Sequence, residues 1–482
     1  MLSYQRSMGQ YDTPISTVKY MVKTVLQEIR HDKRPPLILD PSTGDGVFVK
    51  SLIEAGQNPS HIHAYDIDPE VFLEESEVQF THQDFLKARP SQLFDAIIGN
   101  PPYKSKRQST YFREHKDELE KEFKEIGVHN MYTLFIYKGL QLLKENGILC
   151  MIVQDSFLTN VYYTRFREYL LKNTEILGVI LAPRKLFHSG KADVRTAIIT
   201  VKKGAPASRH QMKLVDRLAT DDYETPPSER VQYLTQSYFH KMPNFNFAIN
   251  VPLEILSLFI TPAYTLADKV DGGTGISTGN DKVFLRKPWE IDTKDKEWIP
   301  FYKNSGIRDR WYYEPKHYIH KNWKKYSQAI PKFTVRNQQY FYREGITCSS
   351  MGIDFQASYL PAGSLFGVNT NLFTENDEDL YYILGLLNSS LTTYMLRKVL
   401  NRTNMITSGY IKKLPYIEPP PQLKRCIANQ VKHIVSEKKK CLSYDFSAHQ
   451  QKINDSIFDV YHISPENRKH VTYFCDMLIE ML

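Results

Sequence analysis

The chain has 482 residues, too many for one compact core, and predicts two or three domains. Its formal net charge of +8 suits a polyanionic partner without requiring one, and its five scattered cysteines form no Cys-x-x-Cys pair, which argues against a disulfide framework or a structural zinc site. The sequence shows no signal-like N-terminus and no long apolar run, so we expect a cytoplasmic protein of prokaryotic or phage type without a membrane span.

The first 204 residues alternate strand-like and helix-like segments. Short apolar runs between breakers predict strands at 37–39, 63–65, 94–98, 147–153, 178–181 and 196–201. A helix is predicted over 132–144, directly before the fourth of these strands. Such alternation indicates an α/β domain over 1–204, with a Rossmann-like, doubly wound sheet that is mainly parallel.

The character of the sequence changes after residue 204. Residues 205–245 are polar and interrupted by prolines, which predicts a connecting segment. Residues 246–420 show no sustained alternation, and we expect a second, mixed α+β domain there. Three consecutive prolines at 419–421 mark a stop, and the pattern of 421–482 predicts a helical tail with charged faces.

A glycine-containing loop follows the first predicted strand. It reads Asp40-Pro41-Ser42-Thr43-Gly44-Asp45-Gly46, and its glycines let a backbone approach a ligand closely, although a simple strand-to-helix turn has the same pattern. Asp66 ends the second strand, 26 residues after Asp40, where a carboxylate can accept both hydroxyls of a ribose. Further on, Asp84 could accept from an adenine amino group and Phe85 could pack on its ring, or Asp84 is a surface aspartate.

The tetrapeptide Asn100-Pro101-Pro102-Tyr103 follows a predicted buried strand. Proline has no backbone N–H, so the carbonyls here can accept hydrogen bonds from a ligand, as can the Asn100 side-chain oxygen. Two acceptors aimed at one exocyclic NH₂ raise the lone-pair density on its nitrogen, which methyl transfer from a sulfonium requires. Tyr103 offers a flat face for a base that leaves the helical stack. A rigid turn that ends the strand is the alternative interpretation.

In their order along the chain, these motifs resemble those of the N6-adenine DNA methyltransferases of the gamma arrangement, such as the TaqI and Eco57I-type methylases. Tyr11-Asp12-Thr13-Pro14 looks like the N-terminal motif of that family, and Lys185-Leu186-Phe187-His188 looks like its later aromatic motif. One departure is that the glycine-rich motif opens with Asp40, where some members carry glutamate.

The resemblance implies S-adenosyl-L-methionine as cofactor and assigns roles to the matched residues. Thr13 would lie near the methionine carboxylate of the cofactor and Asp40 near its ammonium. The implied cofactor-binding residues are Tyr11, Thr13, Asp40, Ser42, Gly44, Asp66, Ile67, Asp84 and Phe85. The implied catalytic residues are Asn100, Pro101, Pro102, Tyr103 and Phe187. Asn100 and the Pro101 carbonyl would bind the target N6, and the rings of Tyr103 and Phe187 would lie on the two sides of the flipped adenine.

The stretch 301–345 combines ten basic residues with only three acidic ones. Its aromatic residues are Tyr302, Trp311, Tyr312, Tyr313, Tyr318, Trp323 and Tyr326, with further ones at 301, 333 and 340–342. Cations bind phosphates and aromatic rings meet bases or sugars, but a solvated basic face over a separate aromatic core is an equally simple interpretation. With segments at 276–279, 298–307 and 385–390, this region resembles a TaqI-like specificity domain. The predicted DNA-binding residues are Lys303, Arg308, Arg310, Lys321, Lys324, Lys325 and Arg336.

The sequence therefore predicts a monomeric, site-specific methyltransferase that acts on adenine N6 in double-stranded DNA, as the modification part of a restriction-modification system. It leaves open whether a separately encoded restriction endonuclease accompanies it. Three alternatives remain: a protein-glutamine methyltransferase, which also uses an Asn-Pro-Pro-Tyr motif, a fused restriction-modification enzyme, and a non-catalytic DNA-binding module. A fused nuclease would need a metal-binding carboxylate cluster, and the sequence offers no convincing one, so we expect no metal.

Overall fold

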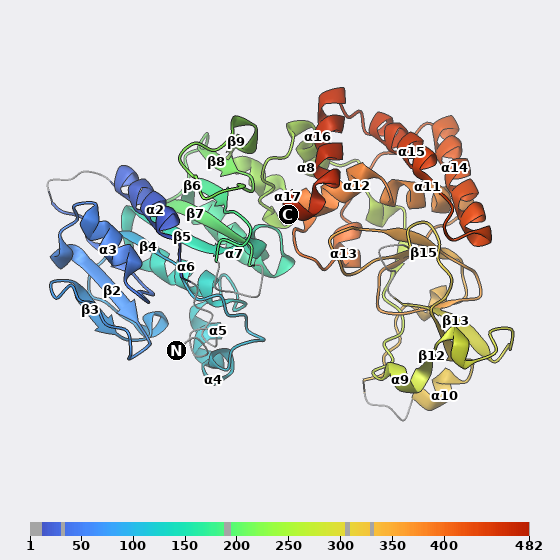
Figure 1. The fold of residues 1–482 in the computed structure, drawn as a ribbon, viewed down its shortest axis with the longest axis horizontal. Coiled ribbons are helices and arrows are strands. Elements are labelled where there is room, and N and C mark those ends of the chain that lie inside the picture. The colour runs from blue at the N-terminus through green and yellow to red at the C-terminus, as the bar shows by residue number, and fades with distance from the viewer. Residues whose placement is uncertain (1–11, 30–33, 188–193, 304–308, 328–331, 482) are drawn as a thin grey trace. The chain divides into compact units, whose positions relative to one another are not determined.

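The computed structural model describes the chain except for residues 1–11, 30–33, 188–193, 304–308, 328–331 and 482. The chain divides into two compact units, residues 1–250 and 251–482 (Figure 1). Within the described residues, no helix combines the length and the apolar character needed to cross a membrane.

A nine-stranded sheet forms the centre of the first unit, in the order β3-β2-β1-β4-β5-β7-β6-β8-β9. Its strands are β1 (Ile38–Asp40), β2 (Ile62–Asp66), β3 (Gln79–His82), β4 (Phe94–Gly99), β5 (Leu143–Gln154), β6 (Thr174–Leu181), β7 (Thr196–Lys203), β8 (Gln211–Val215) and β9 (Val231–Thr235). The strands from β3 to β5 are all parallel, whereas β7 runs antiparallel to both of its neighbours. The α/β, mainly parallel sheet predicted from the sequence is confirmed.

Apolar side chains explain why these segments become strands and helices. β4 and the part of β5 from residue 147 to 153 are almost wholly buried, as the continuous apolar runs predicted. The helices of this unit are α2 (Ile15–Glu28), α3 (Val47–Glu54), α4 (Tyr111–Glu114), α5 (Lys116–Glu122), α6 (Met131–Leu142) and α7 (Thr164–Asn173). Gly139 lets α6 approach the sheet, because a Cβ at this position would lie 2.9 Å from a methyl carbon of Leu149. The sequence did not indicate β3, whose polar, half-exposed residues lie at the edge of the sheet.

The prediction that residues 205–245 form a connecting segment is wrong, because these residues contain β8 and β9 of the same sheet. Both strands are short and lie at or near an edge, and only some of their residues are buried, such as Met212, Leu214 and Val215 of β8. Gln236 follows β9, and its buried side chain accepts from the Ile176 N–H and donates to the carbonyls of Leu171 and Thr174. Because the residues that attach this edge to the sheet are largely polar, their sequence resembles that of a loop.

The second unit combines small sheets with helices, as the expected α+β character requires. Its two four-stranded sheets have the orders β11-β18-β15-β16 and β12-β14-β13-β17, and β10 (Tyr264–Thr265) pairs with β19 (Pro415–Tyr416). The strands of the first sheet are β11 (Asp271–Gly273), β15 (Gly345–Cys348), β16 (Ala357–Leu360) and β18 (Asn371–Phe373). Those of the second are β12 (Leu285–Arg286), β13 (Trp298–Tyr302), β14 (His317–His320) and β17 (Leu365–Phe366).

The expected helical tail is present, but it is not separate from the rest of the second unit. The helices of this unit are α8 (Leu253–Ile260), α9 (Asp281–Phe284), α10 (Trp323–Ser327), α11 (Asp377–Leu387), α12 (Ser390–Tyr394), α13 (Ser408–Ile411), α14 (Pro421–Lys440), α15 (Ser447–Val460), α16 (Pro465–Asp476) and α17 (Leu478–Met481). α14 packs on α11 at Gly385, where a Cβ would lie 3.0 Å from Ile427 and 3.1 Å from Val431. The prolines at 419–421 thus introduce a helix rather than divide two domains.

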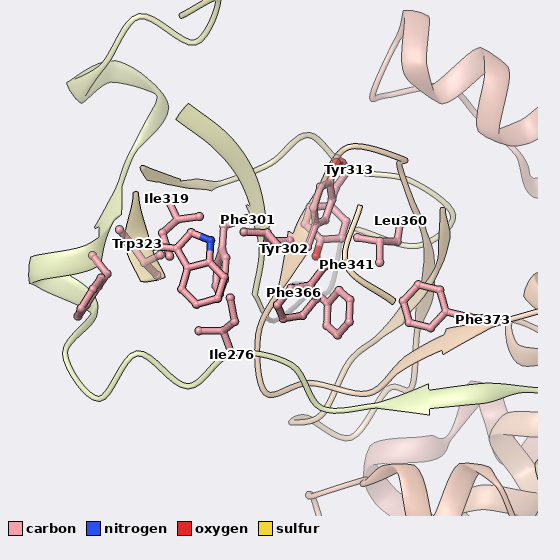
Figure 2. Close-up of a cluster of buried hydrophobic side chains, with 13 residues drawn as sticks. Ile276, Phe301, Tyr302, Tyr313, Ile319, Trp323, Phe341, Leu360, Phe366 and Phe373 are labelled. Carbon is pink, nitrogen blue, oxygen red and sulfur yellow. The ribbon is translucent and has the colours of Figure 1, made fainter. Parts of the chain in front are cut away.

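A cluster of buried aromatic and aliphatic side chains forms a core in the second unit. It includes Tyr302, Tyr313 and Trp323, and Figure 2 shows these rings packed among Phe301, Phe341, Phe366 and other apolar side chains. Trp311 is also fully buried. These aromatic residues of the stretch 301–345 therefore build a core, and the interpretation that the stretch interleaves cations with rings for binding bases is wrong for them.

Candidate active site

The sheet order places the carboxyl ends of β1, β2 and β4 beside one another. The chain reverses the direction of strand addition between β1 and β4, and ligands of doubly wound sheets bind at such a point. A cavity of ≈ 500 Å³ lies in the first unit and is lined by residues that follow these strands. The predicted site residues that line it are Thr13, Ser42, Gly44, Asp66, Ile67, Asp84, Phe85, Asn100 and Pro102.

The glycine-containing loop folds around the carboxylate of Asp66. Gly44 and Gly46 have φ angles of 53° and 78°, which side chains rarely allow. The Gly44 N–H donates to Asp66 Oδ2 at 2.8 Å, and the Asp68 N–H donates to Asp66 Oδ1 at 2.9 Å. Both oxygens are thus held by backbone donors, which fixes a buried carboxylate at the wall of the cavity.

Asp40 is the last residue of β1 and is completely buried, and it does not itself line the cavity. Its Oδ1 accepts from the Ser42 N–H at 3.1 Å, but its Oδ2 has no hydrogen-bond partner among the residues that the structure describes. Burial raises the pKa of the Asp40 carboxyl to about 8, the Ser42 N–H opposes that shift, and the charges of Asp66 and Asp45 add to it. A buried acid with an unused oxygen favours a cationic partner.

A hydrogen bond joins Asn100 to Thr13, which lies 87 residues earlier in the chain. The Asn100 Nδ2 donates to Thr13 Oγ1 at 3.0 Å, and the Ser42 hydroxyl donates to the Asn100 carbonyl at 3.2 Å. The N-terminal segment, the glycine-containing loop and the tetrapeptide are therefore connected through side chains. This arrangement holds the Asn100 amide in one orientation at the cavity.

Asp84 is not the free surface aspartate that the sequence left open. Its Oδ1 accepts from the Leu86 N–H at 3.0 Å, and its Oδ2 accepts from the Tyr111 hydroxyl at 2.6 Å. Burial, reinforced by the Asp84 carboxylate, raises the pKa of Tyr111, so the hydroxyl stays protonated and donates. Phe85 is buried, and its ring lies 5.2 Å from that of Phe135.

Several cavity residues were missed in the sequence. Met131 and Phe135 line the cavity one turn apart on α6, and the predicted helix could have suggested that shared face. Tyr111 also lines the cavity, but it belongs to a short helix, and nothing in the sequence links it to Asp84. Tyr11, a predicted cofactor residue, lies outside the described residues.

Three predicted catalytic residues do not line the cavity. Pro101 is buried, as are Tyr103 and Phe187, and the Tyr103 hydroxyl donates to the Ile152 carbonyl at 2.9 Å. The rings of Tyr103 and Phe187 are in contact, with centroids 6.2 Å apart and planes inclined by 53°. Rings in contact leave no space for a base between them, so their sandwich of a flipped adenine stays a prediction.

The predicted DNA-binding residues fall into two groups, apart from Arg308, which lies outside the described residues. Lys303, Arg310 and Lys321 form ion pairs with Asp281, Asp354 and Glu297, respectively. Lys324, Lys325 and Arg336 are exposed, and no carboxylate within the described part of the chain pairs with them. Across the same described residues, no group of histidine, cysteine and acidic side chains is arranged to hold a metal ion.

Comparison with protein families and curated proteins agrees with this geometry. Residues 49–187 match the Eco57I restriction-modification methylase family. The type II methyltransferase M.HincII of Haemophilus influenzae is 28% identical over 249 residues, which are 50% of this chain and 45% of the relative. The type II methyltransferase M.TthHB8I of Thermus thermophilus is 31% identical over 191 residues, 38% of this chain and 44% of the relative. The chain thus matches less than half of the length of these relatives.

Among solved structures, the type IIL restriction-modification enzyme MmeI in complex with DNA has a similar fold. It is 12% identical, with a TM-score of 0.62 over 97% of this chain and 75% of that one. This likeness concerns the fold, which is that of an α/β methyltransferase in the first unit. The match to the Eco57I restriction-modification methylase family over residues 49–187 agrees with the resemblance inferred from the motifs, which is confirmed over this segment.

Proposed function

We propose that this protein is a site-specific DNA methyltransferase that transfers the methyl group of S-adenosyl-L-methionine to N6 of an adenine in duplex DNA. The observation that carries the proposal is the convergence of Asp66 and Asn100 on one cavity at the reversal point of a methyltransferase sheet, where β1 ends at the buried Asp40. The names of M.HincII and of the adenine-specific methyltransferase BrxX of Escherichia coli, 24% identical over 68% of this chain and 28% of BrxX, support it.

The side chains around the cavity suit the cofactor. The unpartnered Asp40 Oδ2 is a buried acceptor for an ammonium, and the Asp66 carboxylate is held where ribose hydroxyls can donate to it. Phe85 supplies an apolar surface for a purine ring, beside the Asp84 acceptor. When bound, S-adenosyl-L-methionine supplies an electrophilic methyl group on a sulfonium.

Asn100 is the residue that we assign to activation of the target. Its side-chain oxygen and the Pro101 carbonyl accept hydrogen bonds from the exocyclic NH₂ and draw its nitrogen toward tetrahedral geometry. The nitrogen lone pair then forms the new N–C bond as the S–C bond breaks, and a proton leaves N6 after the transfer. Tyr103 and Phe187 would hold the base after their rings move apart, which gives each ring one face of the adenine.

The second unit would bind the duplex. Its exposed Lys324, Lys325 and Arg336 can neutralise phosphates without first breaking an ion pair to a described carboxylate. MmeI and the DNA complex of DrdV, with a TM-score of 0.56, both extend over 90% or more of this chain. We propose that the protein is the modification part of a restriction-modification system and acts as a monomer.

Transfer of tritiated methyl from S-adenosyl-L-methionine tests the function directly. The full chain should label unmethylated duplex DNA, and the digested product should contain N6-methyladenine. Asn100→Ala should abolish labelling while DNA binding is largely kept. Label only in protein would favour a protein-glutamine methyltransferase, and cleavage of unmethylated DNA in Mg²⁺ would favour a fused restriction-modification enzyme.

A further inference from the structure

Lys438, near the end of α14, is a buried lysine without a paired carboxylate. The residue is only 3% exposed. Within the described part of the chain, no acidic side chain lies within ion-pair distance of its ammonium. The contact that the structure gives is with the Phe446 ring, 5.3 Å from Nζ. Burial lowers the pKa of Lys438, while Asp309 raises it and Arg310 lowers it further. The residue is buried as a whole but lines a pocket, so its ammonium can meet an anionic ligand from the pocket side.

The charges around Lys438 leave its ammonium uncompensated. Asp309 acts on it from a distance but is paired with Lys316 at 2.5 Å. Arg310 donates to the two oxygens of Asp354 at 3.1 and 3.4 Å, so these two charges offset each other. Lys438 therefore contributes the excess positive charge of this part of the second unit.

Lys438 faces a pocket of ≈ 380 Å³ rather than the protein interior alone. Arg310, Asp354, Gln356, Tyr444 and Phe446 line the pocket with it. The Gln356 Nε2 donates to Asp354 Oδ2 at 2.9 Å, which holds that carboxylate on the side of Arg310. The Lys438 ammonium is thus the cation that no carboxylate pairs with among the described residues lining the pocket, and Arg310, which is held by Asp354, can add a further N–H donor to an oxyanion.

We propose that this pocket binds a phosphodiester group of the DNA duplex, with Lys438 as its main cation and Arg310 as a second donor. The inference rests on the proposed function and adds Lys438, a cation outside the basic stretch 301–345, to Arg310, which belongs to that stretch. The rings of Tyr444 and Phe446 supply walls against which a sugar next to the phosphate can pack. A phosphate contact of this kind positions the duplex without reading its sequence.

Salt-dependent DNA binding of the full chain tests the pocket. Fluorescence anisotropy with one labelled duplex would give the observed association constant at several salt concentrations. Lys438→Met keeps the apolar stem and removes the charge, and we expect binding to weaken about tenfold and the slope of log K against log salt to fall by about 1. Lys438→Arg keeps the positive charge and should retain the slope. That result would show that the effect of Lys438→Met comes from the lost charge and not from disturbed packing.

Lys440→Met is the matched control, because Lys440 lies on the same end of α14 but is exposed and paired with Glu437. We expect little change in its slope. If both variants lose DNA affinity equally, the effect is a general one of net charge, and the proposed phosphate site at the pocket is wrong. An unchanged slope and affinity in a folded Lys438→Met protein would overturn it as well.

Inorganic phosphate separates the two sources of the same chemistry. If phosphate at constant ionic strength stabilises the wild type against heat but not Lys438→Met, while DNA binding is equal in the two, the pocket holds a free anion and the assignment to DNA is wrong. The proposed function fails separately, when the wild type neither binds nor methylates DNA. If the wild type methylates DNA and Lys438→Met has the same slope of log K against log salt as the wild type, only the proposed pocket is rejected.

Discussion

At the scale of single residues, Asp40 is the buried acid that we propose as the partner of the cofactor's ammonium. Its carboxyl is buried with one oxygen unused, and its pKa of about 8 means that it holds a proton through much of the neutral range. An ammonium beside it would stabilise the carboxylate and lower that pKa. If the cofactor places its ammonium beside Asp40, as we propose, its binding below pH 8 releases a proton from Asp40.

We predict that affinity for S-adenosyl-L-methionine falls as the pH is lowered below 8, by up to about tenfold per pH unit. The sign follows because the free protein binds the proton that the complex must give up. Asp40→Asn should bind the cofactor more weakly and lose this component of the pH dependence. Titration calorimetry across this range is the measurement, and the ratio of the two affinities removes any titration of the cofactor itself. A constant ratio would contradict the role.

Thr13 is a positioning residue for Asn100, and its test separates position from stability. Thr13→Val removes the hydroxyl that accepts from Asn100 Nδ2, and we expect kcat to fall about tenfold because the amide is no longer held in place. Thr13→Ser keeps the hydroxyl and should retain most of the activity. Methyl-transfer kinetics at saturating DNA would show the difference. Equal activity of the valine and serine variants would contradict this role.

At the scale of elements, the edge of the large sheet depends on one polar side chain. Gln236 joins the segment after β9 to the end of α7 and the start of β6, through hydrogen bonds to three backbone groups. The free-energy cost of leaving a buried backbone group without a hydrogen bond exceeds the gain from burying an apolar side chain in place of the glutamine. The attachment of β8 and β9 therefore relies on hydrogen bonds as well as on apolar packing.

We expect Gln236→Leu to destabilise the first unit by about 3 kcal/mol, because three backbone groups lose their partner. Gln211→Leu is the control, since Gln211 is an exposed residue of β8 and its replacement should change stability by less than about 0.5 kcal/mol. Urea unfolding of the full chain, followed by circular dichroism, would measure both. A Gln236→Leu protein as stable as the control would show that packing alone holds this edge.

At the scale of the whole molecule, the first unit holds the segment that matches the methylase family and the cavity, while the second unit contains the whole basic stretch 301–345. That charge is divided, because some cations are paired within the unit and others are exposed. Exposed cations release counterions from DNA most directly. The overall salt dependence of DNA binding should thus depend on a few side chains.

A triple variant of Lys324→Gln, Lys325→Gln and Arg336→Gln should lower the slope of log K against log salt by about 3, if each residue neutralises one phosphate. Lys321→Gln, whose ammonium is paired with Glu297, should change it little. Anisotropy with one duplex over a range of salt would measure both slopes. Equal slopes in the triple variant and the wild type would remove these residues from the DNA interface.

The sequence by itself determined the α/β sheet, the positions of most of its strands in the first 204 residues and the loops that carry Asp40, Asp66 and Asn100. Apolar runs and glycines act locally, and the parallel sheet then brings the ends of the strands together. Tertiary structure alone decided that Thr13 binds Asn100, that Tyr111 binds Asp84 and that the rings of 301–345 are largely core. These contacts join residues far apart in the chain or depend on which side of a strand is covered, and side-chain packing, not local pattern, fixes both.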